Sequence, residues 1–389
     1  MKKYKHDICI VGGFGHIGLP LGIVFAEKGL KVVLYDVNKA NGKIISSGKL
    51  PYVEYEASIP LQKNLKNGNL TLSYKKEIIK HSKNVIVTLG TPIDEYLNPK
   101  ADVFLDAMKE IKPFLSQEQL LIIRSSVYPR IMKSLIQSFG RKFKIAYCPE
   151  RILQGFGVIE LQKLPQLISG SSKKSVKLAS DLFLKITNSI VECSIEEAEL
   201  IKLFSNSWRY IQFATANQFY KLSNDYGIDY HELRKKMIQG YERADGIPQA
   251  GFAAGPCLLK DTMQLSNFSG NNFLLGQAAM NVNEGMPKYL LDKIESTTPV
   301  YKKRIGILGM AFKPNVDDTR DSLSYRLKKE IIFRGGEALC TDPFVKDRNL
   351  LNLNEVLKKA DYFILATPHS EYKKLKTTKK IFSLWDFSK

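Results

Sequence analysis

The sequence of 389 residues is poor in cysteine, histidine and tryptophan, with five, five and two residues of each kind. The cysteines are odd in number, lie far apart and form no C-x-x-C pair, so neither a disulfide framework nor a zinc site is expected. No apolar run reaches the roughly 18 residues that cross a membrane, and the run after the basic start is too short for a secretory signal. We therefore expect a cytoplasmic protein without a metal or a membrane partner. The cysteines are Cys9, Cys148, Cys193, Cys257 and Cys340.

Acidic residues are also scarce. The chain has 39 of them against 58 lysines and arginines, which gives a net charge of +19. Such an excess favours anionic partners, which include nucleic acid, membrane headgroups and phosphorylated small molecules. The basic residues are spread along the whole chain, and no zinc-finger, RNP or basic-arm pattern accompanies them. A lysine-rich solvated surface with small anionic ligands is therefore favoured, and a nucleic-acid partner is not expected.

The chain does contain a clear alternation of elements. Short β-branched runs alternate with amphipathic segments up to about residue 170, which is typical of βαβ units around a parallel sheet. A helical pattern then runs from about Ile195 to Gly227, a residue that suits a helix C-cap. A second helical stretch begins near Cys257, and the strand RIGILGMAF opens another alternating segment. The expected strands of the first part lie at residues 8–11, 31–35, 84–89, 120–124 and 144–146.

These patterns predict an α/β protein with two Rossmann-like domains joined by a helical middle domain that contains a long spine helix. The length is also right for two or three domains. We place the domains at residues 1–194, 195–295 and 296–389.

A glycine-rich turn follows the first expected strand and precedes an apolar helix. Glycines there let the backbone approach a pyrophosphate at the helix N-terminus. Asp36, at the end of the second strand, can accept hydrogen bonds from a ribose diol and would repel a 2′-phosphate. The motif therefore predicts an NAD site, and the alternative is a turn without a ligand. The turn consists of Gly13, Phe14, Gly15, His16, Ile17 and Gly18, where His16 is interpreted as a loop residue beside the cofactor.

The stretch GPCLLKD at residues 255–261 indicates the start of a helix. Gly255 is an acceptable cap, Pro256 suits the first helical position, and Cys257 would lie in the first turn. The positive end of a helix favours a thiolate and can stabilise an oxyanion, and Asp261 lies on the same face. On this evidence alone a buried structural cysteine is slightly favoured, because free cysteines are usually buried.

Lys202 and Asn206 are four residues apart on the expected long helix, so both project from one face. By themselves they are more simply a solvated helix edge than a site.

The order of the motifs resembles the UDP-glucose and GDP-mannose dehydrogenases, more generally the nucleotide-sugar 6-dehydrogenases. The resemblance covers nearly the whole chain. It implies an enzyme that oxidises the C6 hydroxyl of a UDP-sugar to a carboxylate in two NAD-dependent steps, through a cysteine thiohemiacetal and a thioester. The motifs are GFGHIG with Asp36, GTP at 90–92, SSV at 125–127, PER at 149–151, ELIKLFSN at 199–206, GPCLLKD at 255–261 and GMAFKPNVDDTRDS at 309–322.

The resemblance also implies catalytic roles. Cys257 matches the family nucleophile, and Lys202 and Asn206 match the pair that stabilises negative charge on the C6 oxygen. Asp261 matches the aspartate that assists proton removal through an ordered water. Glu150 matches a glutamate associated with thioester hydrolysis. Ser126 stands where the family usually has threonine, and would position water or cofactor.

For the ligands, the resemblance adds Thr91, Ser126 and Arg320 to the cofactor site, with Arg320 near the phosphates. An arginine upstream of the nucleophile is often lent by a neighbouring subunit in this family, and Arg243 stands in that place. We therefore expect a homodimer or a higher homo-oligomer formed through the long helix. The residues expected at the UDP-sugar are Glu150, Arg151, Lys202, Asn206, Arg243, Gly255, Phe312 and Lys313.

Two features of the sequence bear on which sugar the enzyme oxidises. The PER motif resembles the branch that acts on UDP-N-acetylhexosamines, whereas Phe252 and Ala254 replace glycines that the family often has before its nucleophile. We favour a UDP-N-acetylhexosamine, with UDP-glucose as the alternative and surface polysaccharide as the destination of the product. Alternatives of other classes are a non-catalytic dinucleotide-binding protein and a one-step dehydrogenase of the 6-phosphogluconate type. His231 and His369 have no supporting constellation, so a general-base role is not expected for either of them.

Overall fold

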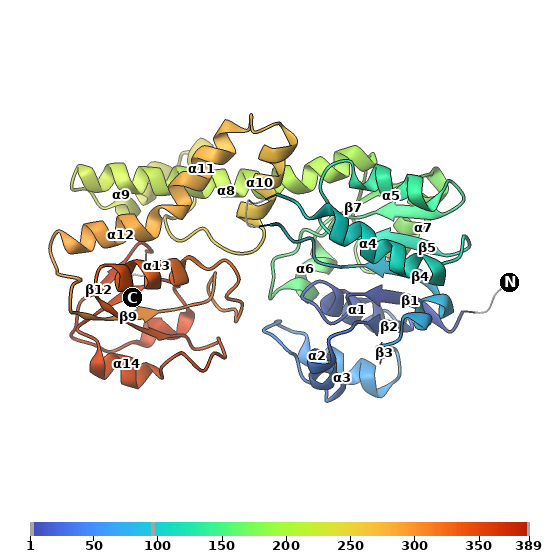
Figure 1. The fold of residues 1–389 in the computed structure, drawn as a ribbon, viewed down its shortest axis with the longest axis horizontal. Helices are drawn as coiled ribbons and strands as arrows, with labels where there is room; N and C mark the ends of the chain where they lie inside the picture. Colours follow the sequence, from blue (N-terminus) through green and yellow to red (C-terminus); the bar gives the residue numbers. More distant parts are fainter. Residues whose placement is uncertain (1–3, 95–97, 387–389) are drawn as a thin grey trace. The chain divides into compact units, whose positions relative to one another are not determined.

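A computed structural model describes residues 4–94 and 98–386 of the chain (Figure 1). The chain divides into two compact units, Met1–Leu203 and Phe204–Lys389. The boundary between them falls inside the long helix. The predicted division into three domains, at residues 194 and 295, stays a prediction.

The first unit is built on one sheet with the strand order β3-β2-β1-β4-β5-β6-β7-β8. All neighbouring strands are parallel except β6 and β7. The five runs expected from the sequence are strands, whereas β3, β7 and β8 were not predicted. For β8 the reason is physical, since this three-residue strand is partly exposed and lacks a long apolar run. The strands are β1 (His6–Val11), β2 (Val32–Tyr35), β3 (Leu70–Ser73), β4 (Ser82–Val87), β5 (Leu120–Ile123), β6 (Lys144–Tyr147), β7 (Gln166–Gly170) and β8 (Ile190–Glu192).

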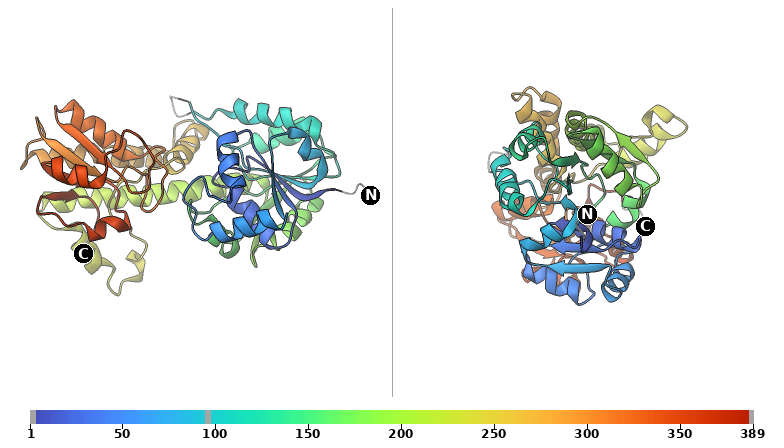
Figure 2. Two further views of the ribbon diagram at one scale, coloured as in Figure 1. Left: turned by 90° about the horizontal axis from the view of Figure 1, so that it is seen from below. Right: turned by 90° about the vertical axis from the view of Figure 1, so that its right-hand side faces the viewer.

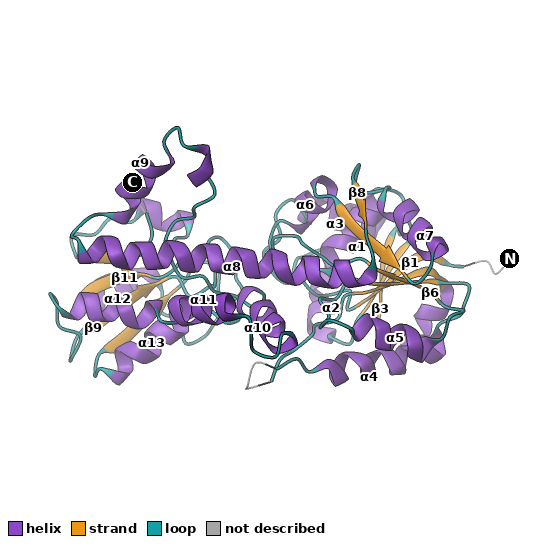
Figure 3. Ribbon diagram, turned by 90° about the horizontal axis from the view of Figure 1, so that it is seen from above, coloured by secondary structure: helices purple, strands orange, loops and turns teal. Residues whose placement is uncertain are grey.

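Helices cover both faces of this sheet, which buries both sets of side chains on each central strand (Figure 3). Along β1, Ile8 and Ile10 join the core beneath α1, α3, α6 and α7, whereas Cys9 and Val11 join the core beneath α4 and α5. The β1 sequence is therefore a continuous apolar run rather than an alternating one. The helices are α1 (Gly18–Glu27), α2 (Lys39–Ser46), α3 (Ser58–Lys66), η1 (Lys76–His81), α4 (Ala101–Ile111), η2 (Lys112–Phe114), α5 (Ile131–Phe139), α6 (Gly157–Lys163) and α7 (Lys173–Phe183).

The spine helix α8 (Ile195–Asp225) is a single helix of 31 residues, drawn in yellow-green in Figure 2. Its end is set by Gly227, which has φ +70°. The amide of Gly227 donates to Asn224 O at 3.0 Å, and the amide of Ile228 donates to Ser223 O at 2.8 Å. These bonds satisfy carbonyls of the last turn. The long helix and its glycine stop, both expected from the sequence, are confirmed.

The second unit combines helices with a four-stranded parallel sheet in the order β10-β9-β11-β12. One apolar core joins Ala216 and Tyr220 of α8, Leu290 of α12 and Ile305 of β9, so the helical and sheet parts share their interior. The predicted fold class is confirmed. The elements are α9 (Tyr230–Ile238), η3 (Glu242–Ala244), α10 (Leu258–Phe268), α11 (Leu274–Glu284), α12 (Met286–Glu295), β9 (Arg304–Leu308), α13 (Leu323–Phe333), β10 (Glu337–Thr341), α14 (Leu353–Lys359), β11 (Tyr362–Leu365), η4 (Ser370–Lys374) and β12 (Ile381–Ser383).

Among the helices of the described residues, none combines the length and the apolar character that crossing a membrane requires.

Candidate active site

The glycines of the turn between β1 and α1 have different steric surroundings. A Cβ on Gly18 would lie 2.5 Å from Gly12 O, and one on Gly13 would lie 2.8 Å from Leu34 Cβ, so both positions require glycine for packing. At Gly15 the nearest atom would be 3.5 Å away, which leaves the backbone open to a ligand. A tight turn, an open glycine and a helix N-terminus together suit the pyrophosphate of a dinucleotide.

Asp36 lies beside this turn. Its Oδ2 accepts a hydrogen bond from the amide of Phe14 at 3.1 Å, and its Oδ1 accepts one from the amide of Asn38 at 3.0 Å. The carboxylate is therefore held where the ribose of a bound NAD would lie. The residues of the turn fit this cofactor, as the sequence predicted.

His16 packs against a tyrosine that the sequence did not single out. The His16 and Tyr52 ring centroids are 3.9 Å apart, and the Tyr52 hydroxyl donates to Gly15 O at 2.7 Å. Gln154 Nε2 lies 3.2 Å from His16 Nδ1. This agrees with the interpretation of His16 as a loop residue. Tyr52 comes from a segment without a motif, so no sequence signal marked it.

Three predicted residues follow neighbouring strands of the same sheet. Thr91, Ser126 and Glu150 come after β4, β5 and β6, whose carboxyl ends share one edge. The Thr91 hydroxyl donates to Ser126 O at 2.6 Å, so these two are in contact. The carboxyl edge of a parallel sheet is where ligands bind in such folds.

Glu150 is held in a buried ion pair that the sequence did not predict. Its Oε2 accepts from Arg124 Nε at 3.1 Å and also from Arg124 Nη2, and both side chains are nearly inaccessible. Its Oε1 accepts from the amides of Arg151, at 2.8 Å, and Ile152, at 3.2 Å. Both carboxylate oxygens are thus engaged in fixing the segment after β6. The predicted part of Glu150 in thioester hydrolysis stays a prediction.

Lys202 and Asn206 do not form a solvated edge of α8. Each has only 8% of its surface exposed. The alternative of an exposed Lys/Asn pair is therefore wrong. Buried polar groups need partners, and Asn206 has one on α10 of its own unit: its Nδ2 donates to Asp261 Oδ2 at 2.6 Å.

Asp261 is fully buried on α10, and both of its carboxylate oxygens face polar groups. Oδ2 accepts from Asn206, whereas Oδ1 has no hydrogen-bond partner among the described residues but lies 3.3 Å from Lys260 Nζ in an ion pair. The predicted part of Asp261 in proton removal stays a prediction.

Cys257 lies one turn before Asp261, and its carbonyl accepts the Asp261 amide at 2.9 Å. The helix α10 begins at Leu258, so Cys257 is its N-cap rather than a first-turn residue, and Gly255 two residues earlier has φ +105°, which is outside the helical region. The predicted start of the helix was therefore too early. The thiol still lies at the positive end of the helix, and it is exposed rather than buried.

The loop that carries Cys257 is anchored by a relay of buried amides. The Gly251 amide donates to Asn217 Oδ1 at 2.9 Å, and Asn217 Nδ2 donates to Asn283 Oδ1 at 2.9 Å. Asn283 Nδ2 in turn donates to Tyr210 O at 3.0 Å. Both asparagines are completely buried, and they tie the loop to α8 and α11.

The same loop is packed against the sheet part of its unit. A Cβ on Gly251 would lie 2.3 Å from the Trp385 ring, and a Cβ on Gly255 would lie 2.5 Å from the Phe312 ring. Gly255 also has φ +105°, which other residues rarely adopt. Phe312 therefore contacts the loop directly, which the sequence did not indicate.

Phe312 belongs to the loop after β9, which contains the predicted nucleotide contacts. Lys313 Nζ lies 5.9 Å from the Phe312 ring centroid. Arg320 Nη2 donates to Asp318 Oδ2 at 2.6 Å. The hydrogen bond to Asp318 raises the pKa of Arg320, and the Cys257 sulfur adds to this effect. The Arg320 guanidinium and the Cys257 thiol are thus within electrostatic range of each other.

Two further predicted residues lie outside these clusters. Arg243 is exposed on η3, with its guanidinium 5.9 Å from the Tyr241 ring centroid. Arg151 Nη2 donates to Pro165 O at 2.6 Å. In the part of the chain that the structure describes, no group of His, Cys, Asp and Glu side chains is arranged to bind a metal.

Models of one protein family match most of the chain. Models of the UDP-glucose/GDP-mannose dehydrogenase family match residues 6–187 with its NAD binding domain, 196–285 with its central domain and 306–385 with its UDP binding domain.

Several relatives carry more specific names. A UDP-N-acetyl-D-mannosamine dehydrogenase of Methanococcus aeolicus is 30% identical over 96% of this chain and 86% of its own. An enzyme of the same name from Pyrococcus horikoshii is 30% identical over 93% of this chain and 89% of its own. The solved structure of UDP-D-ManNAc dehydrogenase from Pyrococcus horikoshii is 27% identical, has a TM-score of 0.90, and the match covers 98% of this chain and 96% of that one. The chain therefore belongs to the UDP-glucose/GDP-mannose dehydrogenase family and is an NAD-dependent nucleotide-sugar dehydrogenase.

Proposed function

We propose that the enzyme oxidises the C6 hydroxyl of a UDP-N-acetylhexosamine, with UDP-N-acetyl-D-mannosamine as its preferred substrate, to the uronic acid. The observation that carries the reaction is the grouping of an exposed Cys257 at a helix N-terminus, a buried Asp261 one turn later, and Asn206 bonded to that aspartate. The names of the relatives and the PER motif support the choice of sugar.

Asp261 and the two polar residues of α8 would carry the first oxidation. Oδ1 of Asp261, which makes no hydrogen bond to the described residues and lies 3.3 Å from Lys260 Nζ, takes the proton of the C6 hydroxyl through a water. Lys202 and Asn206 hold the negative charge that develops on the C6 oxygen. When bound, NAD supplies the hydride acceptor in both oxidations, so that one alcohol, one water and two NAD⁺ give one carboxylate, two NADH and three protons.

Cys257 would make the second oxidation possible. Its sulfur forms a bond to the aldehyde carbon, and the carbonyl oxygen takes a proton to give a thiohemiacetal. Oxidation of this adduct leaves a thioester on Cys257. Water then attacks the acyl carbon, the C–S bond breaks, and the thiol is regenerated with a free carboxylate.

The test is a panel of UDP-N-acetyl-D-mannosamine, UDP-N-acetylglucosamine, UDP-glucose and GDP-mannose with NAD, followed by NADH absorbance. We expect the highest kcat/KM with UDP-N-acetyl-D-mannosamine and two NADH per sugar consumed. Cys257→Ala should abolish carboxylate formation, and Asp261→Asn should lower kcat about 100-fold or more. A higher kcat/KM with UDP-glucose would refute the sugar, and full activity of Cys257→Ala would refute the two-step mechanism.

We also propose that the enzyme is a homodimer joined through α8. Four large apolar residues on this helix and Tyr226 directly after it are 39% to 84% exposed, and helical spacing would place them within an arc of about 60°. Exposed apolar residues gathered on one side of a helix are typical of an interaction surface. We expect light scattering to give the mass of two chains and Trp208→Glu to give a monomer. A monomeric wild-type protein would contradict this proposal. The residues are Phe204, Trp208, Phe219, Leu222 and Tyr226.

In the dimer, Arg243 would contact the substrate of the neighbouring subunit. We propose the cytoplasm as the compartment, where NAD is available and the five free cysteines stay reduced. The product would supply surface polysaccharide synthesis.

A further inference from the structure

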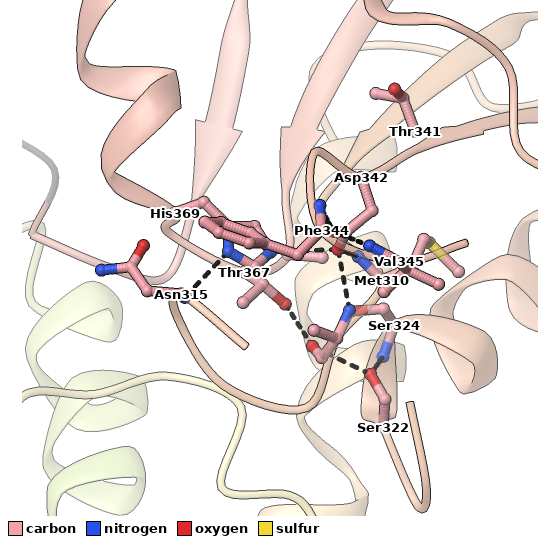
Figure 4. Close-up of polar contacts among 12 residues, drawn as sticks. Met310, Asn315, Ser322, Ser324, Thr341, Asp342, Phe344, Val345, Thr367 and His369 are labelled. Carbon is pink, nitrogen blue, oxygen red and sulfur yellow. Dashed lines mark hydrogen bonds and ion pairs between the residues drawn. The ribbon is translucent and has the colours of Figure 1, made fainter. Parts of the chain in front are cut away.

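His369, which was not expected to act as a general base, lies in a buried polar network of the second unit (Figure 4). Its side chain is completely inaccessible, and its Nε2 lies 3.0 Å from Asp342 Oδ2. Asp342 follows β10 and His369 follows β11, the two neighbours of β9 in the sheet. The loop that follows β9, residues 309–322, is therefore flanked by this pair.

Asp342 is the anchor of the network. Its Oδ2 accepts the amides of Met310 at 2.6 Å and Ala311 at 2.9 Å, and its Oδ1 accepts those of Phe344 and Val345 at 2.8 and 3.0 Å. Burial by itself would raise the pKa of this carboxyl, but the hydrogen bonds from His369 and the backbone outweigh it and hold the pKa below its usual value. Asp342 is therefore an ionised acceptor that fixes the start of the loop.

The second nitrogen of His369 reaches the middle of the same loop. Its Nδ1 accepts the amide of Asn315 at 2.9 Å, so the ring proton lies on Nε2 and is donated to Asp342. Asn315 has φ +58°, a left-handed conformation that asparagine adopts more readily than most residues. Its Oδ1 accepts the amide of Ser370 at 2.9 Å. The turn at Asn315 is thus held in its left-handed shape by bonds from outside the loop.

This turn follows the proposed nucleotide contacts. Phe312 and Lys313 immediately precede it, and Arg320 follows it in the same loop. We propose that His369 is a positioning residue for UDP-sugar binding, because its bond to Asn315 sets the conformation in which this loop presents Lys313 and Phe312 to the nucleotide. The inference rests on the proposed function, since it assumes that this loop contacts the nucleotide. His369 itself touches neither substrate nor cofactor.

Two conservative variants separate the two bonds of His369. In His369→Gln the amide nitrogen can still donate to Asp342, but no acceptor remains for the Asn315 amide. In His369→Asn the side-chain oxygen occupies the place of Nδ1 and can accept from Asn315, but the side chain no longer reaches Asp342. The affinity for UDP, measured by titration calorimetry, should therefore fall about tenfold in His369→Gln and less than threefold in His369→Asn. The kcat at saturating substrate should stay within about twofold for both variants.

Control variants distinguish an effect on the loop from a general effect of replacing a histidine in this unit. His231→Gln is the matched control, because His231 Nε2 contacts Leu384 O in the same unit and has no bond to the loop, and it should bind UDP as the wild type does. Affinity for NAD should not change in any variant. If His369→Gln does not fold, His369→Ala replaces it and should bind UDP about tenfold more weakly than His369→Asn.

Equal UDP affinity in wild type and His369→Gln would overturn the inference, as would a lower kcat at unchanged UDP affinity. A wild-type protein that binds no UDP would instead refute the proposed function.

Discussion

At the scale of the residue, the five cysteines differ in burial: three are buried, one is half-buried and one is exposed. Burial raises the pKa of Cys9 and Cys148 to about 12 and that of Cys340 to about 11, so these thiols are protonated near neutral pH. Burial also raises the pKa of the half-buried Cys193. Only Cys257 of the five is exposed, and it lies at the N-terminus of α10. A thiolate is the reactive form, so reactivity should concentrate at Cys257.

We therefore expect iodoacetamide near neutral pH to label Cys257 first, with activity falling in step with this label. Peptide mass spectrometry identifies the site. Bound UDP-sugar should slow the reaction, and Cys257→Ser should remain largely unlabelled. Complete labelling of Cys257 with full activity retained would contradict its role as the nucleophile. Cys193 serves as the internal comparison because it is partly accessible.

At the scale of the element, the asparagine relay holds the cysteine loop against two helices. Replacing Asn217 by alanine would leave the Gly251 amide and Asn283 Oδ1 buried without partners, which costs about 1–3 kcal/mol for each group. We expect Asn217→Ala to lower the free energy of unfolding and to reduce kcat at least tenfold through displacement of the loop. Urea unfolding and steady-state kinetics measure the two effects.

The matched control for this relay is Asn224→Ala. Asn224 is on the same helix and donates to Tyr220 O and Tyr289 Oη, but it has no bond to the loop. It should lose stability with little change in kcat. Equal losses of kcat in the two variants would mean that the relay does not act on the loop.

At the scale of the whole molecule, no apolar core of the described residues extends from one unit into the other. Every core cluster of the described residues draws its buried members from one unit only. We expect two transitions in scanning calorimetry. NAD at about 100 times its Kd adds about 2.7 kcal/mol to the unit that binds it, which raises one transition by roughly 5–10 °C. UDP should raise the other. A single transition shifted equally by both ligands would contradict this separation.

Much of the fold was predictable because its signals are local. Continuous apolar runs identified the central strands, the glycine spacing identified the dinucleotide turn, and the helical period with Gly227 identified α8. β8 was missed because it is a short, partly exposed edge strand without a pattern of its own. The start of α10 was set too early, because proline and glycine mark a helix start only to within a residue or two.

The sequence by itself determined the family, because the order of its motifs along nearly the whole chain is that of the nucleotide-sugar dehydrogenases, and the family models match the same three parts of the chain. The tertiary structure decided which polar groups are paired. It bonded Asn206 to one oxygen of Asp261, and it placed Glu150 in a buried pair with Arg124. Such partners are distant along the chain, and a hydrogen bond has no periodicity, so only the folded arrangement reveals it.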